Sequence, residues 1–317
     1  MLARFGNLAS EEASIVPQMS IFKQLILGLL LPAIAGGGIL ILAKSIALKK
    51  ESEYKNGLAS RWLIAVALSA GYIVGYIGLE GLPPFPPREG VHWLCYLAII
   101  GLISGAFWHS SRSGRLIVQV GLSIVIPRLL LHSAFKYTWG QFEGVIWWMC
   151  IAVAIFIFWH IVQQSFTILP SGGSSPFVYF GISGGTALIL AVSGSLRLAQ
   201  HAGILVAVFA ASWILTLVGQ RSENKWQVFP ISASPVVALL LSGIWMNGYF
   251  YEEVPAMSAI LLAIALFLAP VGRIEKIQQL GVRRSTFIQI AIIALPVVIA
   301  IGIAVARSGL FGESEGY

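Results

Sequence analysis

A charged residue inside an apolar run is the clearest chemical signal in this sequence. Arg128 follows Pro127 within the run, and His132 comes four residues later, so a helix would place both side chains on one face. A charge at depth in a membrane is costly and usually faces the interior of a bundle or a wet cavity. We therefore interpret Arg128, His132 and Glu143 as binding residues, in an anion contact or a proton-coupled gate. The alternative is that Arg128 reaches lipid headgroups or forms a structural pair.

Two short glycine-rich segments could turn backbone N–H and C=O groups toward a solute. One follows Pro32 in the first apolar run, and the other lies in the sixth. Paired interruptions at equivalent positions of two halves point to a midplane binding site in transporters. The alternative is close helix packing through small residues. The predicted binding residues here are Gly36, Gly37, Gly38, Ser183, Gly184, Gly185 and Thr186.

One catalytic pattern can be set aside on distance. Gly181-Ile182-Ser183-Gly184 resembles the GxSG string of rhomboid proteases, which need a histidine at the same membrane depth on a later helix. His201 is the only later histidine, and along a helix it would lie about 27 Å away at 1.5 Å per residue. The serine–histidine pair cannot form.

All 13 acidic residues are Glu, so every mechanism that needs an aspartate is excluded. No two histidines have metal-ligand spacing on one helix, and the sequence has no phosphate-binding loop or dinucleotide motif. We expect no metal and no cofactor. These patterns favour a protein that is not an enzyme, and an intramembrane lipid-modifying enzyme is kept as an alternative.

The composition indicates that lipid is the main solvent of this chain. Hydrophobic residues make up 57% of the sequence, charged residues 10%, and the mean hydropathy is +0.86. Soluble domains carry about 25% charged residues, so this chain cannot cover a water-facing surface with charge. Because lipid offers the backbone no hydrogen-bond partners, its apolar runs must be helices.

The apolar runs predict an all-α, polytopic membrane bundle of about ten transmembrane helices. We treat residues 1–317 as a single transmembrane domain. The predicted spans are 21–43, 62–80, 92–109, 116–135, 144–165, 176–196, 201–219, 231–251, 255–271 and 286–306.

The first and sixth spans also indicate an internal repeat. Residues 34–43 and 182–191 are identical at seven of ten positions. Five helices per half would make this an inverted repeat, with halves 21–166 and 176–306, a common plan of secondary transporters. Chance matching of apolar strings is the alternative.

In size and helix count, the chain is similar to the drug/metabolite transporter group, which has ten spans in two five-helix halves. A ten-helix core with broken first and sixth helices also resembles the amino-acid/sodium symporter plan. Both similarities concern architecture and involve no specific motif. The drug/metabolite group keeps both termini in the cytoplasm, which differs from the orientation expected here.

The distribution of Lys and Arg predicts that orientation. The loops after odd-numbered spans hold 13 of them, whereas the even loops and the two termini together hold six. Positive loops stay in the cytoplasm, so we expect both termini outside. This bias accounts for the net charge of +7 without a nucleic-acid partner, and the lipid bilayer is the expected partner.

The leading functional hypothesis is a carrier in the cell membrane for a small or amphipathic solute. It rests on the helix count, the repeat, the two glycine segments and Arg128. The first alternative is a non-catalytic membrane scaffold or assembly subunit. The second is the intramembrane enzyme.

The orientation gives a first testable prediction. Reporter fusions should place both termini outside, and single cysteines in the loops should report ten crossings, because the odd loops carry most of the positive charge. The check is labelling with a membrane-impermeant thiol reagent. Both termini inside would contradict the charge argument, and termini on opposite sides would exclude a five-plus-five repeat.

Overall fold

The computed structural model describes residues 21–49, 58–106, 112–168, 174–219, 231–268, 274, 277, 279 and 282–308. Every regular element in these residues is a helix. They are α2 (Ile21–Leu25), the π-helical turn η1 (Ile26–Leu30), α3 (Leu31–Lys49), α4 (Leu58–Glu80), α5 (Gly90–Ala106), α6 (Arg112–Leu130), α7 (His132–Tyr137), α8 (Gln141–Ile168), α9 (Ser174–Val192), α10 (Leu196–Gly219), the short 3-10 helix η3 (Ile231–Ala233), α11 (Ser234–Tyr251), α12 (Ala256–Phe267) and α14 (Val282–Arg307).

Eight of the described helical stretches are long and apolar enough to cross a membrane. Two further apolar helices, α5 and α12, have 17 and 12 residues. Together they match the ten predicted spans one to one, which confirms an all-α, multi-pass membrane bundle. The count of ten crossings stays a prediction, since α12 as described would be about 18 Å long and a typical hydrocarbon core is about 30 Å thick.

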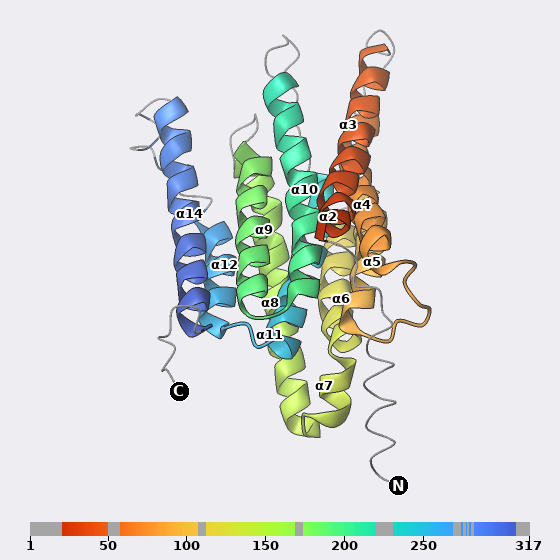
Figure 1. Cartoon of the computed structure of the whole chain (residues 1–317), viewed down its shortest axis with the longest axis vertical. Coiled ribbons are helices and arrows are strands. Elements are labelled where there is room, and N and C mark those ends of the chain that lie inside the picture. Colours follow the sequence, from red (N-terminus) through yellow and green to blue (C-terminus); the bar gives the residue numbers. More distant parts are fainter. Residues whose placement is uncertain are drawn as a thin grey trace.

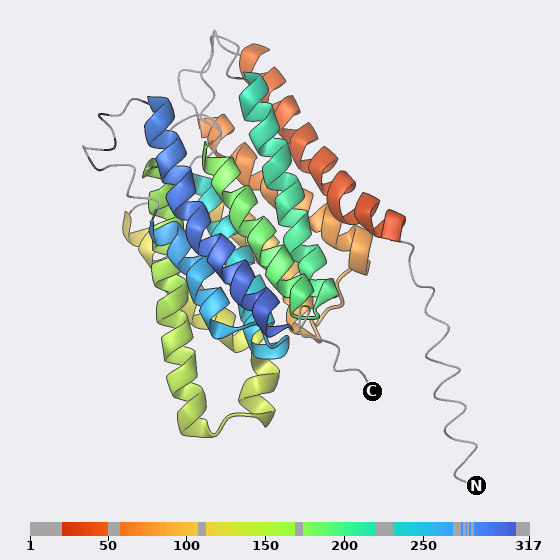
Figure 2. The same ribbon diagram turned by 60° about the vertical axis from the view of Figure 1, so that its left-hand side comes forward.

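Several helices that are close along the chain pack as antiparallel pairs, namely α3 with α4, α6 with α8, α9 with α10 and α12 with α14 (Figures 1 and 2). The α9–α10 hairpin turns through Ser193–Ser195, where Gly194 has a φ of +92°. That left-handed conformation favours glycine because it has no Cβ. The α7–α8 hairpin extends beyond the neighbouring helix ends at one end of the bundle.

Helix α11 is the centre of the bundle. Its span is 89% buried, far more than any other, and it packs most extensively against α5 and α8. A Cβ at Gly243 of α11 would lie 2.8 Å from Leu94 Cδ2 of α5, so the glycine lets these two helices approach closely. Because α11 is enclosed, the outer helices provide the lipid-facing surface.

A second close contact joins α3, α4 and α10. A Cβ at Gly71 of α4 would lie 2.8 Å from Val208 Cγ2 of α10 and 3.2 Å from the Pro32 carbonyl oxygen of α3. At Gly75, one turn on, it would lie 2.5 Å from Pro32 Cγ and 2.8 Å from Ile204 Cγ2. These glycines therefore set the spacing of the three helices.

The helix contacts agree only partly with the predicted inverted repeat. Helix α3 packs on α4 as α9 packs on α10, and α6 packs on α8 as α12 packs on α14. Between the halves, α5 packs on α11 and α4 on α10, which are equivalent helices. However, α9 also packs along α14, and in the described part of the chain α3 and α8 make no comparable contact. The repeat stays a prediction.

We predict that Gly75→Ala destabilises the bundle by about 1–3 kcal/mol, the usual cost of overpacking. The new Cβ would meet ring and branched carbons of Pro32 and Ile204 that have little freedom to move. Thermal unfolding in detergent is the measurement. Gly302→Ala in α14 is the matched control, since a Cβ there meets nothing within 4 Å. Equal melting temperatures for the two variants would refute this packing argument.

Candidate functional site

The first predicted glycine segment lies in a helix contact. A Cβ at Gly36 would lie 3.2 Å from both the Ala67 carbonyl oxygen of α4 and Val208 Cγ1 of α10. Gly37 also faces α10, whereas Gly38 has open space within 4 Å. Gly36 therefore lets α3 approach α4 and α10 closely, whereas a Cβ at Gly37 would make only ordinary contacts with α10.

Helix α3 is not interrupted at these glycines, contrary to expectation. It continues as an α-helix from Leu31 to Lys49. The irregular backbone lies earlier, in the π-helical turn Ile26–Leu30. Helix α9 likewise runs unbroken through its own glycines.

The second glycine segment faces a different neighbour. A Cβ at Gly185 would collide with Val297 of α14, whereas Gly184 has open space within 4 Å. The Ser183 side chain is fully buried, and its hydroxyl has no hydrogen-bond partner among the described residues. The two glycine segments thus pack on different helices and form no common contact, and their role in binding a solute stays a prediction.

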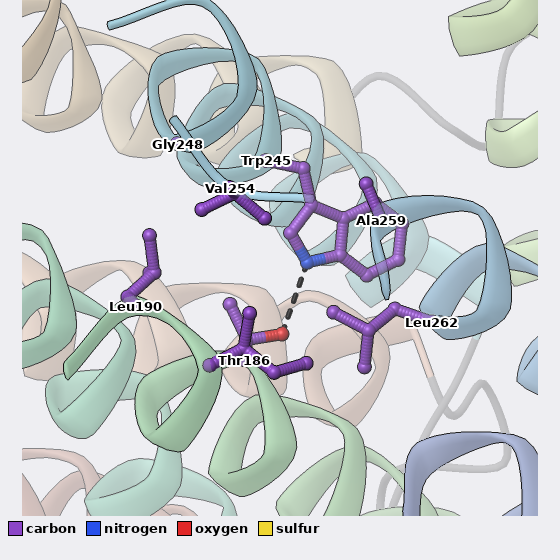
Figure 3. Close-up of a pocket in the computed structure, with 8 residues that line it drawn as sticks. Thr186, Leu190, Trp245, Gly248, Val254, Ala259 and Leu262 are labelled. Atoms are coloured by element: carbon purple, nitrogen blue, oxygen red, sulfur yellow. Dashed lines mark hydrogen bonds between the residues drawn. The ribbon is translucent and has the colours of Figure 1, made fainter. Parts of the chain in front are cut away.

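Thr186 is the best-connected residue of the second segment. Its Oγ1 accepts a hydrogen bond from Trp245 Nε1 of α11 at 3.0 Å and donates one to the Ile182 carbonyl at 2.9 Å (Figure 3). The pair borders a small, mostly apolar cavity. The other lining residues are Ile189, Leu190, Gly248, Val254, Ala259 and Leu262. With both hydrogen-bonding functions engaged, Thr186 acts here as a link between α9 and α11.

Arg128 and His132 come together, as their spacing predicts. Both line a cavity of about 140 Å³ at the end of α6, although the helix breaks at Leu131 between them. Glu143 is not part of this cavity; its side chain is exposed on α8, and it makes no ion pair with Arg128. The Arg128 guanidinium lies instead over the Phe135 ring, 4.6 Å from its centroid.

A group of charges that the sequence analysis did not assemble joins α4 to α10. Arg197 of α10 binds Glu80 of α4 through two bonds, Nε to Oε1 at 2.7 Å and Nη2 to Oε2 at 2.9 Å. Its Nη1 donates to Glu89 Oε2 at 2.7 Å. Glu80 is the less exposed carboxylate, at 18% against 54% for Glu89. One guanidinium therefore holds two carboxylates, and the paired bonds to Glu80 are the stronger geometry.

From Glu80 the polar contacts continue into the bundle. His201 is fully buried, with Nε2 at 3.4 Å from Glu80 Oε1 and Nδ1 at 3.3 Å from the Tyr72 hydroxyl. The neutral ring with its proton on Nε2 donates to Glu80 and accepts from Tyr72. The protonated ring donates at both nitrogens, and Tyr72 then accepts. The three side chains form a carboxylate–imidazole–phenol chain about 12 Å long along α4.

Tyr76 lies beside this chain. Its ring centroid is 5.2 Å from that of His201. Its buried hydroxyl has no hydrogen-bond partner within the described ranges. An unpaired buried hydroxyl is costly, so this position is a place where a water or a solute group could be accepted.

Side chains of α5 fix the loop that carries Glu89. The Tyr96 hydroxyl donates to the Pro84 carbonyl at 3.1 Å. His92 Nδ1 accepts from the backbone N–H groups of Arg88 and Glu89, at 3.3 and 3.2 Å. Because two donors face Nδ1, the ring proton lies on Nε2. These contacts place Glu89 within reach of Arg197.

The signal that could have revealed this site is an i, i+4 ladder on two apolar spans. Tyr72, Tyr76 and Glu80 recur every fourth residue, as do Arg197 and His201. Residues at this spacing share a helix face. Nothing in the sequence pairs Glu80 or Glu89 with Arg197, which lies 117 and 108 positions away from them.

The sequence matches no known family model and no curated protein. The class of protein is therefore assigned from its helices and side-chain contacts. The molecule is a multi-pass, all-α membrane protein. Ionisable side chains in contact with one another lead from Arg197 and Glu80 to buried His201 between α4 and α10, and a basic cavity lies beside them.

The geometry predicts unequal coupling of the two carboxylates to Arg197. A double-mutant cycle with Glu80→Gln and Arg197→Gln should give a coupling free energy on the order of 1 kcal/mol, the upper range for partly exposed pairs. The same cycle with Glu89→Gln should give less, because that bond is single and more exposed. Unfolding in detergent is the measurement. A larger coupling for Glu89 would contradict the site described here.

Proposed function

We propose that this protein is a membrane carrier for a small solute and that its transport cycle is coupled to protonation of the Glu80–His201–Tyr72 chain. The supporting observation is the continuous set of contacts from exposed Arg197 to buried Tyr72. Ionisable side chains inside membrane spans are costly, and they commonly belong to ion pathways or proton relays. In this proposal the host membrane is the cell membrane, with both termini outside.

The location of the chain supports the same proposal. It lies between α4 and α10, the second and seventh apolar helices, which are equivalent in the predicted inverted repeat. Carriers built from such repeats bind solute and coupling ion where the halves meet. The predicted glycine segments on α3 and α9 contribute to the same carrier as packing or binding residues.

His201 is the residue that couples the proton to structure. The neutral ring with its proton on Nε2 can take up a second proton only at Nδ1, the nitrogen that faces Tyr72, and the charged ring then donates to both Glu80 and Tyr72. The change reverses the direction of the Tyr72 hydrogen bond. Because Tyr72 and Glu80 belong to α4 and His201 to α10, protonation alters the contact between the two helices.

Transport driven by a pH gradient tests the proposal. Proteoliposomes would be offered a panel of inorganic phosphate, small monocarboxylates and amphipathic organic cations. We expect gradient-driven uptake of at least one compound. Glu80→Gln and His201→Gln should lower that uptake by tenfold or more, since neither amide can take up the proton. His160→Gln is the matched control, because His160 is an exposed histidine bonded to Gln164.

Other outcomes separate the alternatives. Equal gradient-driven uptake by wild type, Glu80→Gln and His201→Gln would overturn the coupling role. Product formation from labelled lipid, lost in His132→Ala or Glu143→Gln, would favour an intramembrane enzyme.

A scaffold or assembly subunit is the second candidate, and one feature favours it. The α7–α8 hairpin extends beyond the neighbouring helix ends (Figures 1 and 2). Near its tip, Tyr137 and Phe142 are 76% and 80% exposed, as a partner-binding element would require. A stable co-purifying partner, lost in Phe142→Ser, with no uptake of any panel compound, would support this function over the carrier.

A further inference from the structure

The cavity at the end of α6 carries more positive charge than its surroundings balance. Its cationic side chains are Arg88 and Arg128, and its one carboxylate is Glu89. Glu89 Oε2 already accepts from Arg197 at 2.7 Å. In the part of the chain that the structure describes, neither Arg88 nor Arg128 has an ion pair.

The donors approach the cavity from two separate segments. Arg88 comes from the loop before α5, which His92 and Tyr96 hold in place. Arg128 comes from the end of α6, where its guanidinium lies over the Phe135 ring. This stacking orients the planar group, and none of its N–H groups has an acceptor among the described residues. Two arginines from separate segments thus line one cavity, and the Arg128 guanidinium is held over the Phe135 ring.

The size and the other donors favour a tetrahedral anion. The cavity has about 140 Å³, several times the roughly 10–15 Å³ that one water needs on the same measure. His132 and Ser133 add an imidazole and a hydroxyl to the lining. A carboxylate has two oxygens to share among these groups, whereas a phosphate group offers three or more. A single arginine guanidinium can donate two parallel hydrogen bonds to two oxygens of one phosphate group.

We propose that this cavity is a binding site for a phosphate group, held by Arg88 and Arg128 with help from His132. The phosphate belongs to an inorganic or solute phosphate, or to a lipid headgroup. Trp93 lines the cavity, and the stacked Trp139 and Trp147 rings lie on the adjoining α7–α8 hairpin, with centroids 5.9 Å apart. Tryptophans gather at the depth of headgroups, so both sources can reach the site. The inference requires no transport activity.

Direct binding to the purified full-length protein in a neutral detergent tests the site. Two probes, inorganic phosphate and short-chain phosphatidylglycerol, would be titrated at constant ionic strength, with calorimetry as the readout. We expect at least one probe to bind, and Arg88→Gln or Arg128→Gln to weaken it by tenfold or more, since each removes a charge-assisted pair. Arg128→Lys should fall between, because it keeps the charge without the bidentate fork. Arg307→Gln, which removes an exposed arginine of α14, should bind as the wild type does.

The two probes identify the source of the phosphate. Binding of the lipid alone supports a headgroup site, and binding of inorganic phosphate alone or of both supports a site for free phosphate. The proposal is overturned if neither probe binds, or if Arg88→Gln and Arg128→Gln bind as the wild type does while melting at the same temperature. Neither result depends on whether the pH-gradient uptake assay succeeds.

Discussion

Hydrocarbon offers a polypeptide backbone no hydrogen-bond partner, and the architecture of this protein follows from that constraint. Each crossing must satisfy its own N–H and C=O groups, so all regular elements of the described chain are helices. Lipid tails are as apolar as leucine and provide little drive for helices to associate. Close contact must supply the attraction, as at Gly71 and Gly75, where α3, α4 and α10 meet. Glycine there is a requirement of packing.

The same solvent explains where the charges lie. Glu80 ends α4 and Arg197 begins α10, so their charged ends stay near water while their helices continue into the bundle. His201, one turn deeper, is fully buried and must use both ring nitrogens for hydrogen bonds. An ion pair that only joined α4 to α10 would need Glu80 and Arg197 and no further residue. The continuation through His201 to Tyr72 gives the contact between the two helices two protonation-dependent forms.

The fold was largely predictable from the sequence, whereas the site was predictable only in part. Long apolar runs fix helices by composition, and Arg128 and His132 line one cavity although the helix breaks between them. The glycines were harder, because a glycine in a helix looks the same whether it meets a solute or a neighbouring helix. The Arg197–Glu80 pair joins residues 117 positions apart, and only tertiary packing brings them into contact. Local spacing carries no information about which helices become neighbours.

Glu89 connects the basic cavity with the buried polar chain. It lines the cavity, and it also accepts from Arg197, whose other bonds hold Glu80. An anion in the cavity would compete with Glu89 for nearby positive charge and repel it toward Arg197. Protonation of Glu80 would weaken its hold on Arg197 and leave that guanidinium freer for Glu89. Because coupling free energies are reciprocal, any effect of an anion on protonation must equal the effect of protonation on anion affinity. Under the two proposals, the anion cavity and the buried polar chain therefore form one linked electrostatic system through Glu89.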